Sequence, residues 1–457
     1  MKPGVPMNPS RRLFLKSAAA AGVAGAAFNP WLQLNALADA SSGASGYKAL
    51  VCVFLHGGND GNNLLLPYEP DEYALYSQAR GVLGLARERV LPVAPTNTAG
   101  RRFALHPSFT RLQGLFDGGQ AAVLANVGPL VVPTTKVDYQ RGLVALPANL
   151  FSHADQQAAW QTDSFSASLK GGWGGRLLER LVDGGAAHRG YACVSLSGGA
   201  LWGAGDGTLQ PYRVPVSGAF GFEGYTPDSQ DALSYALDSL VRQTRSDPFE
   251  AAWLQSLGRS MDNQRVLTQA LGGASAPASI PANTELGQQL AMVAKLIQAR
   301  DTMGLQRQCF FCSIGGFDTH GADQLTTQRD KFAEIDAAVA GFHAALQGMG
   351  LQDQVTLFTA SDFGRTLVSN GQGSDHGWGS HHLVVGGAVN GGQVLGRFPS
   401  HVIGGADDIG GGNWVPTMAL DQFGADLGRW FGAGDSALDE IFPRRAQFDA
   451  GLGLMKA

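Results

Sequence analysis

Continuous apolar runs alternate with amphipathic stretches along most of this chain. Residues 49–55 read Ala-Leu-Val-Cys-Val-Phe-Leu, a run typical of a strand that is buried on both faces. Further strands are predicted over residues 121–127, 191–196, 308–314, 354–359 and 383–389. Helical patterns lie between them, over residues 177–181, 228–241, 286–299 and 326–346. This alternation predicts an α/β fold with a mostly parallel central sheet flanked by helices.

One long segment interrupts the alternation. Residues 198–228 are rich in Gly, Pro and Ser, and the chain that follows is mainly helical up to about residue 299. We interpret residues 197–305 as a helical insertion or cap on a single α/β domain that spans residues 41–457. No internal repeat with a period of roughly 20–50 residues is visible.

The N-terminus carries an export pattern. Ser10-Arg11-Arg12-Leu13-Phe14-Leu15-Lys16 precedes a mostly Ala and Gly stretch over residues 18–28. Two adjacent arginines before such a stretch are typical of a twin-arginine signal, and the stretch is shorter than the ~20 residues of a spanning helix. We predict that residues 1–40 are a signal peptide read by the twin-arginine translocase. The mature chain would then lie in the periplasm or outside the cell, with no integral membrane segment.

The amino-acid composition indicates which partners are unsuitable and where the glycines and cysteines lie. The 33 Lys and Arg face 38 Asp and Glu, a net charge of −5 that argues against a nucleic acid partner. The 63 glycines are about twice the usual ~7% and show no three-residue period, so they belong in turns and close backbone approaches. The four cysteines are predicted to be buried thiols, since Cys309 and Cys312 would point to opposite faces of a strand.

Aspartates and histidines gather in the loops that follow the predicted strands at residues 49–55, 308–314 and 354–359. Ligands bind beyond the carboxyl ends of parallel strands, so we expect these loops to meet at one edge of the sheet. Converging carboxylates and imidazoles are what a divalent metal ion needs, and Zn, Mn and Ca are the candidates. The candidate ligands are Asp60, Asp318, His320, Asp362, Asp375, His376 and His382.

Simpler alternatives stay open for these residues. Asp60 stands in a turn-forming Asn-Asp-Gly, and Asp362 is placed to cap a helix. His381 and His382 would point to opposite sides of an extended segment, so at most one of them faces the site. Arg365 either binds an anionic substrate or pairs with Asp362.

A nucleophile is harder to identify. Ser152 opens a predicted helix, where backbone N–H groups favour an anion, although it equally suits an ordinary helix cap. The sequence contains no Gly-x-Ser-x-Gly elbow, dinucleotide fingerprint or Walker loop.

A set of motifs in a fixed order carries a family resemblance. After the twin-arginine start come Val-Phe-Leu-His-Gly-Gly-Asn-Asp-Gly-Asn-Asn, Leu-His-Pro, Ser-His, Gly-Gly-Trp-Gly-Gly-Arg, Phe-Asp-Thr-His, Ser-Asp-Phe-Gly-Arg-Thr and Asp-His-Gly. From about residue 47 to 445 the chain resembles the bacterial family called domain of unknown function 1501. The resemblance implies a relative of the alkaline phosphatase and sulfatase superfamily, with an alkaline-phosphatase-like fold and a two-metal hydrolytic site.

The resemblance also implies roles for single residues. Asp60 resembles the metal-binding Asp after the first strand, and Ser152 loosely resembles the nucleophile at a helix N-terminus. Asp318 with His320 resembles the Asp/His pair of one metal, Asp362 resembles the Asp of an Asp-His dyad, and His376 resembles the final histidine ligand.

The chain departs from the superfamily pattern at the dyad, where Phe363 stands in place of the histidine. The Asp318 and His320 pair is also more closely spaced than the usual Asp-x-x-x-His, and the sulfatase nucleophile motif is absent. Either Asp375 or His382 replaces the missing ligand, or one metal site is lost.

Two hypotheses follow. The first is an exported metal-dependent hydrolase of phosphate or sulfate esters that acts on a small molecule or glycan ester, with Arg365 holding the transferred group. Ser152 or a water molecule bound by the metal would attack. The second is a non-catalytic periplasmic binding or assembly protein on the same fold. The converging Asp and His favour the first, and Phe363 with the missing nucleophile motif favours the second.

Overall fold

The structure is a computed structural model that describes residues 46–165, 171–183, 190–207, 209–218, 221, 224–227, 229–449 and 451–456. The predicted signal peptide, residues 1–40, lies outside these residues, so it stays a prediction. Across the described part of the chain, no helix has both the length and the apolar composition needed to cross a membrane.

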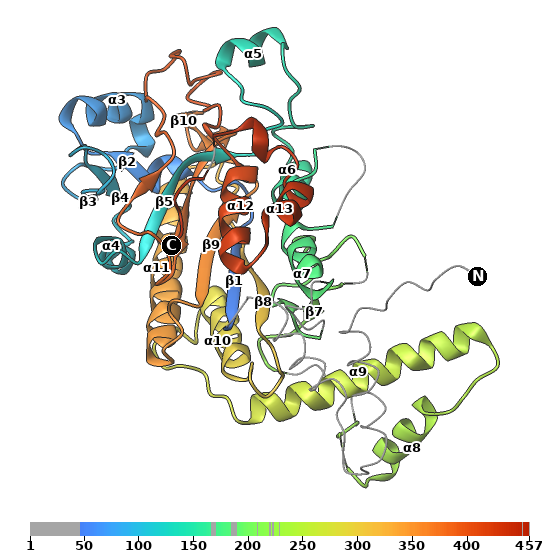
Figure 1. The fold of residues 1–457 in the computed structure, drawn as a ribbon. Helices are drawn as coiled ribbons and strands as arrows, with labels where there is room; N and C mark the ends of the chain where they lie inside the picture. Colours follow the sequence, from blue (N-terminus) through green and yellow to red (C-terminus); the bar gives the residue numbers. More distant parts are fainter. Residues whose placement is uncertain are drawn as a thin grey trace, which may run out of the picture.

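A nine-stranded sheet runs through the centre of the described chain (Figure 1). Its strand order is β13-β5-β12-β9-β1-β8-β6-β7, and β14 pairs with β5. The strands are β1 (Lys48–Leu55), β5 (Ala121–Gly128), β6 (Cys193–Ser195), β7 (Tyr212–Arg213), β8 (Arg307–Ile314), β9 (Val355–Ser361), β12 (Ser380–Val385), β13 (Val394–Leu395) and β14 (Met418–Ala419). Only the pairs of β12 with β5 and β9 are antiparallel. The predicted mostly parallel sheet is confirmed.

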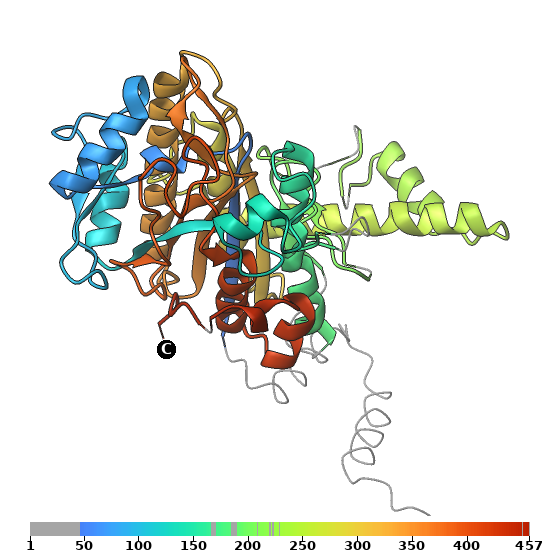
Figure 2. The same ribbon diagram turned by 90° about the horizontal axis from the view of Figure 1, so that it is seen from above.

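Helices cover both faces of this sheet, and Figure 2 looks down on the resulting layers. Because side chains alternate along a strand, Val51 and Val53 enter one core while Cys52 and Phe54 enter the other. The first core is closed by α4 (Thr110–Asp117), α10 (Glu285–Gln298) and α11 (Gln324–Gly348). The second is closed by α6 (His153–Thr162), α7 (Trp173–Asp183), α12 (Leu420–Phe431) and α13 (Asp435–Ile441). The flanking helices expected from the sequence are therefore present.

Smaller elements surround the carboxyl ends of the parallel strands. An antiparallel sheet in the order β2-β4-β3 packs with the helix α3, and β10 pairs with β11 in a hairpin. These elements are β2 (Leu65–Pro67), α3 (Pro70–Arg80), β3 (Leu91–Val93), β4 (Phe103–Leu105), β10 (Arg365–Ser369) and β11 (Ser374–His376). Short helices complete the described chain: η2 (Gly61–Asn63), η3 (Gly81–Leu83), α5 (Lys136–Arg141) and η4 (Arg445–Gln447).

A helical arm projects from the body in both views (Figures 1 and 2). It consists of α8 (Ala232–Val241) and α9 (Pro248–Gly272). Asp247 caps the start of α9 by accepting from two backbone N–H groups, and Pro248 suits the first helical position. Leu267 and Leu271 near the other end of α9 are buried in the first core. The predicted insertion at 197–305 thus combines a projecting arm with α10, which belongs to the core.

One predicted strand is shorter in the structure, and all four cysteines are buried. The last predicted strand, at 383–389, is observed as β12 over Ser380–Val385. It ends before Gly386, where a Cβ atom would lie 2.8 Å from the Val355 carbonyl oxygen. The prediction of buried thiols is confirmed, since all four cysteines are free and buried.

Candidate functional site

The loops after β1, β8 and β9 meet at one edge of the sheet, as expected. The last residue of β1, Leu55, lies in register with Ile314 of β8 and Ser361 of β9. Gly57 has a φ of +116°, and a Cβ atom there would lie 2.4 Å from the Asp318 nitrogen. A glycine is needed at this position because the two loops touch through their backbones.

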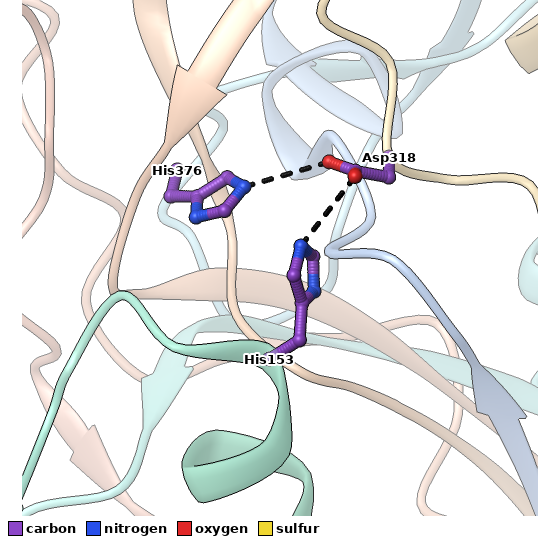
Figure 3. Close-up of side chains that lie close together, drawn as sticks. All are labelled: His153, Asp318 and His376. Carbon is purple, nitrogen blue, oxygen red and sulfur yellow. Dashed lines mark ion pairs between the residues drawn. The ribbon is translucent and has the colours of Figure 1, made fainter.

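Three side chains form what we call the His–Asp–His centre: His153, Asp318 and His376 (Figure 3). They come from the start of α6, the loop after β8, and β11. One donor atom from each lies within 4.8 Å of the others. The Nε2 atoms of His153 and His376 each lie 3.5 Å from an Asp318 carboxylate oxygen.

Hydrogen bonds on the far side of each ring set the orientation of both imidazoles. His153 Nδ1 lies 2.6 Å from an Asp362 oxygen, and His376 Nδ1 lies 2.8 Å from the Phe151 carbonyl oxygen. Carbonyl and carboxylate oxygens accept hydrogen bonds, so each Nδ1 carries the hydrogen. In the neutral rings both Nε2 lone pairs then face Asp318, which is how histidine ligands of metals are oriented.

Asp362 is buried directly behind His153. Its carboxylate also accepts from the Gly57 N–H at 3.2 Å and from Gln157 Nε2 at 2.9 Å. The structure thus brings Asp362 to the site, but as the hydrogen-bond acceptor of His153 rather than as the metal ligand expected from the sequence. The capping alternative also does not apply, because the segment that follows is the strand β10.

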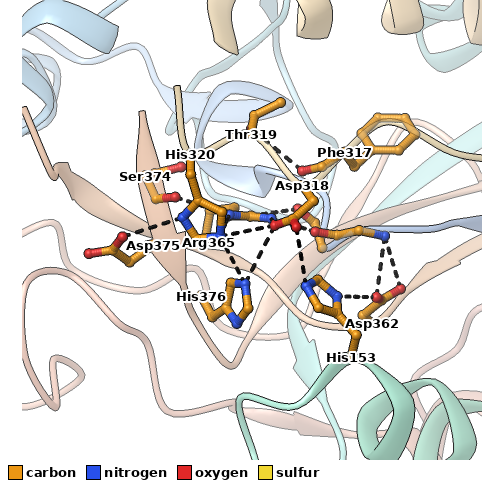
Figure 4. A network of polar contacts seen from close by, with 12 residues as sticks. His153, Phe317, Asp318, Thr319, His320, Asp362, Arg365, Ser374, Asp375 and His376 are labelled. Atoms are coloured by element: carbon orange, nitrogen blue, oxygen red, sulfur yellow. Dashed lines mark hydrogen bonds and ion pairs between the residues drawn. The ribbon is translucent and has the colours of Figure 1, made fainter. Parts of the chain in front are cut away.

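Arg365 lies beside Asp318 and His320 and forms hydrogen bonds with each of the segments that meet there (Figure 4). Its Nε donates to the Gly58 carbonyl, and its Nη1 to the Ser374 carbonyl and to His320 Nε2, at 3.0, 3.0 and 3.2 Å. Its Nη2 donates to the Gly57 carbonyl and pairs with Asp318. All five N–H donors of the buried guanidinium are therefore used. Of the two predicted roles, pairing with Asp362 is wrong because the partner carboxylate is Asp318, and no donor remains for a substrate anion.

The electrostatics of the centre favour an ionised carboxylate. Burial acts to raise the pKa of Asp318, but the hydrogen bond and charge of Arg365, with the charges of His153 and His320, hold that pKa below its ordinary value. Burial lowers the pKa of His376, which favours the neutral ring. An ionised carboxylate beside the neutral ring of His376 is the protonation state that binds a metal ion.

His320 and Asp375 lie at the rim of the centre. His320 Nε2 is 3.0 Å from an Asp318 oxygen and 3.0 Å from His376 Nε2. Its Nδ1 lies 3.5 Å from Asp375, a side chain that is 61% exposed. The structure therefore places both predicted residues next to the centre, with Asp375 the more distant.

Asp60 and His382 are not part of the centre. The Asp60 carboxylate is buried in an ion pair with Arg80 and also accepts from Gln324 Nε2 at 2.8 Å. The ring of His382 packs edge-on against Trp160, and burial lowers its pKa to about 3. The expectation that these two residues act as ligands does not agree with the geometry, because a guanidinium occupies the first and core side chains enclose the second.

His153 is the residue that the sequence analysis missed. The sequence predicts Ser152 as a candidate nucleophile at the start of a helix, and Ser152 does precede α6, with no capping hydrogen bond from its side chain. The neighbouring His153 is the side chain that points into the centre (Figure 3). Two features of the sequence could have indicated His153. Ser-His is one of the ordered motifs, and Asp362 is followed by Phe363 instead of the histidine of the superfamily dyad.

Phe363 forms an apolar wall of the site. Its ring centroid lies 4.8 Å from that of His153 and 4.5 Å from that of His376. The residue in the position of the dyad histidine therefore packs the two imidazoles in place instead of binding a metal ion.

Two imidazole nitrogens and one carboxylate oxygen suit a transition-metal ion. Catalytic zinc sites keep three protein ligands and one open position, and Mn accepts a similar set. Calcium takes six to eight oxygen ligands and fits poorly here. Of the ions expected from the sequence, Zn and Mn thus match the donor atoms.

Solved structures with a similar chain path are distant in sequence. The PsFucS1 sulfatase from Pseudoalteromonas sp. is 13% identical with a TM-score of 0.38, covering 94% of this chain and 78% of its own. The soluble domain of lipooligosaccharide phosphoethanolamine transferase A from Neisseria meningitidis is 8% identical with a TM-score of 0.34, covering 88% and 93%. Alkaline phosphatase PafA is 11% identical with a TM-score of 0.27, covering 71% and 64%. These similarities are too distant to assign an activity.

The family is settled by sequence. No curated protein matches this chain. A family model does match, over residues 47–408, which is most of the chain and includes the His–Asp–His centre. The resemblance seen in the ordered motifs is therefore confirmed, and the chain belongs to the family described as protein of unknown function DUF1501.

Proposed function

We propose that this protein is an exported, metal-dependent hydrolase of phosphate or sulfate esters. One observation carries the proposal: the Nε2 atoms of His153 and His376 face the Asp318 carboxylate, while Asp362 and the Phe151 carbonyl hold the opposite ring nitrogens. Such outer hydrogen bonds raise the basicity of metal-binding imidazoles and fix their orientation.

His153, Asp318 and His376 would hold the ion, and Zn or Mn suits them best. When bound, the ion would polarise a phosphoryl or sulfuryl oxygen and lower the pKa of the attacking group. The ester would come from a small molecule or a glycan. Export by the twin-arginine route remains part of this proposal.

The surrounding residues have separate tasks. Asp362 holds the hydrogen on His153 Nδ1, and Arg365 keeps Asp318 ionised and fixed against the Gly57 loop. Ser152 is the candidate nucleophile, because its side chain makes no capping hydrogen bond and it adjoins His153. Phe363 excludes water from one side of both imidazoles.

The test begins with protein purified from its native export route and analysed for bound metal. We expect about one Zn or Mn per chain in the wild type, and much less in Asp318→Ala and His153→Ala. Asp330→Ala is the matched control, since Asp330 is a 65% exposed aspartate on α11. All four proteins are then assayed on aryl phosphate, phosphodiester and aryl sulfate substrates. Equal turnover by wild type and Asp318→Ala would contradict the proposal, as would a wild type that neither contains nor responds to Zn or Mn.

A second function is favoured by one observation. Because every N–H of Arg365 is bonded within the protein, the centre keeps no spare guanidinium for a substrate anion. This would suit a non-catalytic binding or assembly protein on the same fold. The same experiment separates the two, since this alternative predicts stoichiometric metal without turnover of any of the three substrate types.

A further inference from the structure

The tip of the α8–α9 arm carries an apolar surface that no other element of the described chain covers. A cavity of about 460 Å³ opens there, and all its lining residues belong to the arm. We call these residues the arm tip: Leu240, Arg245, Phe249, Glu250, Trp253 and Leu254. The Phe249 side chain is 85% exposed and that of Trp253 is 62% exposed. Contiguous exposed aromatic surface of this kind marks an interaction site, unlike scattered single residues.

The arm holds this surface away from the body. Leu267 and Leu271 anchor one end of α9 in the first core, while Phe249 and Trp253 lie in the first two turns at the opposite end. Both views show α8 and α9 extending beyond the α/β layers (Figures 1 and 2). A partner can therefore reach the arm tip without contacting the body.

The arm tip also contains opposite charges that have no charged partner. Arg245 contacts the Gln243 amide at 2.9 Å, but within the described residues it pairs with no carboxylate, and Glu250 pairs with no cation. Both side chains line the same cavity. Each is therefore available to a partner that brings the opposite charge to the same place.

We infer that the arm tip docks onto the arm tip of a second copy of this chain. A two-fold contact uses one patch twice, so the patch must complement itself. This patch has both parts, since it contains a cavity and, on the lining of that cavity, the highly exposed aromatic residue Phe249. Arg245 of each copy can meet Glu250 of the other. Insertion of the aromatic ring into the partner's cavity buries the apolar surface of both copies.

A membrane surface is the less suitable occupant. Interfacial helices carry an excess of Lys and Arg on their polar face, which attracts anionic lipids. Around the arm tip Arg242 and Arg245 are balanced by Asp247 and Glu250. The charges thus complement one another across a dimer rather than attracting a lipid headgroup layer.

The test measures the dissociation constant of the mature full-length chain by sedimentation equilibrium. We expect a monomer–dimer equilibrium, and Phe249→Asp should raise the dissociation constant by roughly tenfold or more. Leu143→Asp is the matched control, because Leu143 is 61% exposed, lies outside the arm and should leave the constant unchanged.

A charge exchange makes the test specific for self-association. Arg245→Glu and Glu250→Arg should each weaken the dimer, and the double variant should restore it, because both copies then carry the exchanged pair. A wild type that stays monomeric at its highest soluble concentration would overturn the inference, whether or not it binds lipid vesicles. A dimer that is insensitive to these variants would overturn it as well.

Discussion

Two buried carboxylates stand just beyond the ends of neighbouring parallel strands, Asp60 after β1 and Asp362 after β9. Asp60 is neutralised by the Arg80 guanidinium at the end of α3. Among the residues that the structure describes, Asp362 pairs with no arginine, and its hydrogen bonds come from a backbone N–H, an amide and the ring of His153. Equal positions thus serve different purposes: one carboxylate stabilises the fold, and the other orients an imidazole whose far nitrogen stays available.

The largest expected effect is on the Asp60 side. Arg80→Met should lower the free energy of unfolding by about 3–5 kcal/mol, because it leaves a buried carboxylate without its partner. Urea denaturation measures this loss. Metal affinity of the folded variant should stay at the wild-type value, and a parallel loss of metal would break the distinction between the two carboxylates.

The next largest effect is the dependence of stability on pH that we expect from His401. This residue packs near Tyr76, on the same side of the molecule as Asp60. Burial, with smaller contributions from the charges of His381, Arg80 and Arg101, lowers the pKa of His401 to about 3 in the folded protein. Below pH ~6.5 the unfolded chain takes up a proton that the folded chain does not, so stability is complete above that pH and falls as the pH decreases.

His401→Phe should remove this penalty and keep the stacking on Trp414. Between pH 7.5 and pH 5, the decrease in the free energy of unfolding should be about 2 kcal/mol smaller in the variant than in the wild type. Urea denaturation at the two pH values checks this. Parallel losses in both proteins would show that His401 is protonated in the folded state.

On the Asp362 side the effect should appear in metal affinity. Asp362→Asn removes the charge that the His153 ring faces, and such changes typically cost about 10–100-fold in affinity. Competition with a chromophoric chelator measures this. Arg80→Met is the control, since we expect it to lower the free energy of unfolding without changing metal affinity, and Asp362→Asn to do the reverse. Unchanged metal affinity in Asp362→Asn would contradict the proposed role of His153 as a ligand.

The smallest effect is expected at the rim. Asp375 is 61% exposed and meets His320 Nδ1 only at 3.5 Å. Asp375→Asn should change stability by no more than about 0.5 kcal/mol, as for other exposed pairs, and should leave metal stoichiometry unchanged. Thermal unfolding and elemental analysis check both, and a loss of bound metal would place Asp375 among the ligands.

Much of the fold could be predicted from local patterns. The run at 49–55 corresponds closely to β1, and the post-strand loops converge because β1, β8 and β9 are parallel neighbours. The partner of each polar group could not be predicted in the same way. Arg80 reaches Asp60 only after α3 folds against β10, so no spacing in the chain separates a paired aspartate from a free one.

The position of His153 and the exposure of the arm could not be predicted for a similar reason. His153 follows a helix start, and which of two adjacent side chains enters the site depends on how α6 rotates against β9. For the arm, apolar periodicity predicts helices but not whether their apolar faces are covered. Trp253 is two-thirds exposed whereas Leu254 beside it is buried, a difference set by where α8 lies on α9.

Arg365 also fixes the arrangement of the centre in the absence of any ligand. Its guanidinium is bonded to the backbone carbonyls of Gly58 and Ser374, so a fixed positive charge lies beside the Asp318 carboxylate. The arrangement of the centre is therefore fixed by bonds within the chain itself. The proposed ion would meet donor atoms that are already arranged, so little ordering would remain to oppose its binding. Binding of the proposed ion would thus require no unfolding or refolding of the chain.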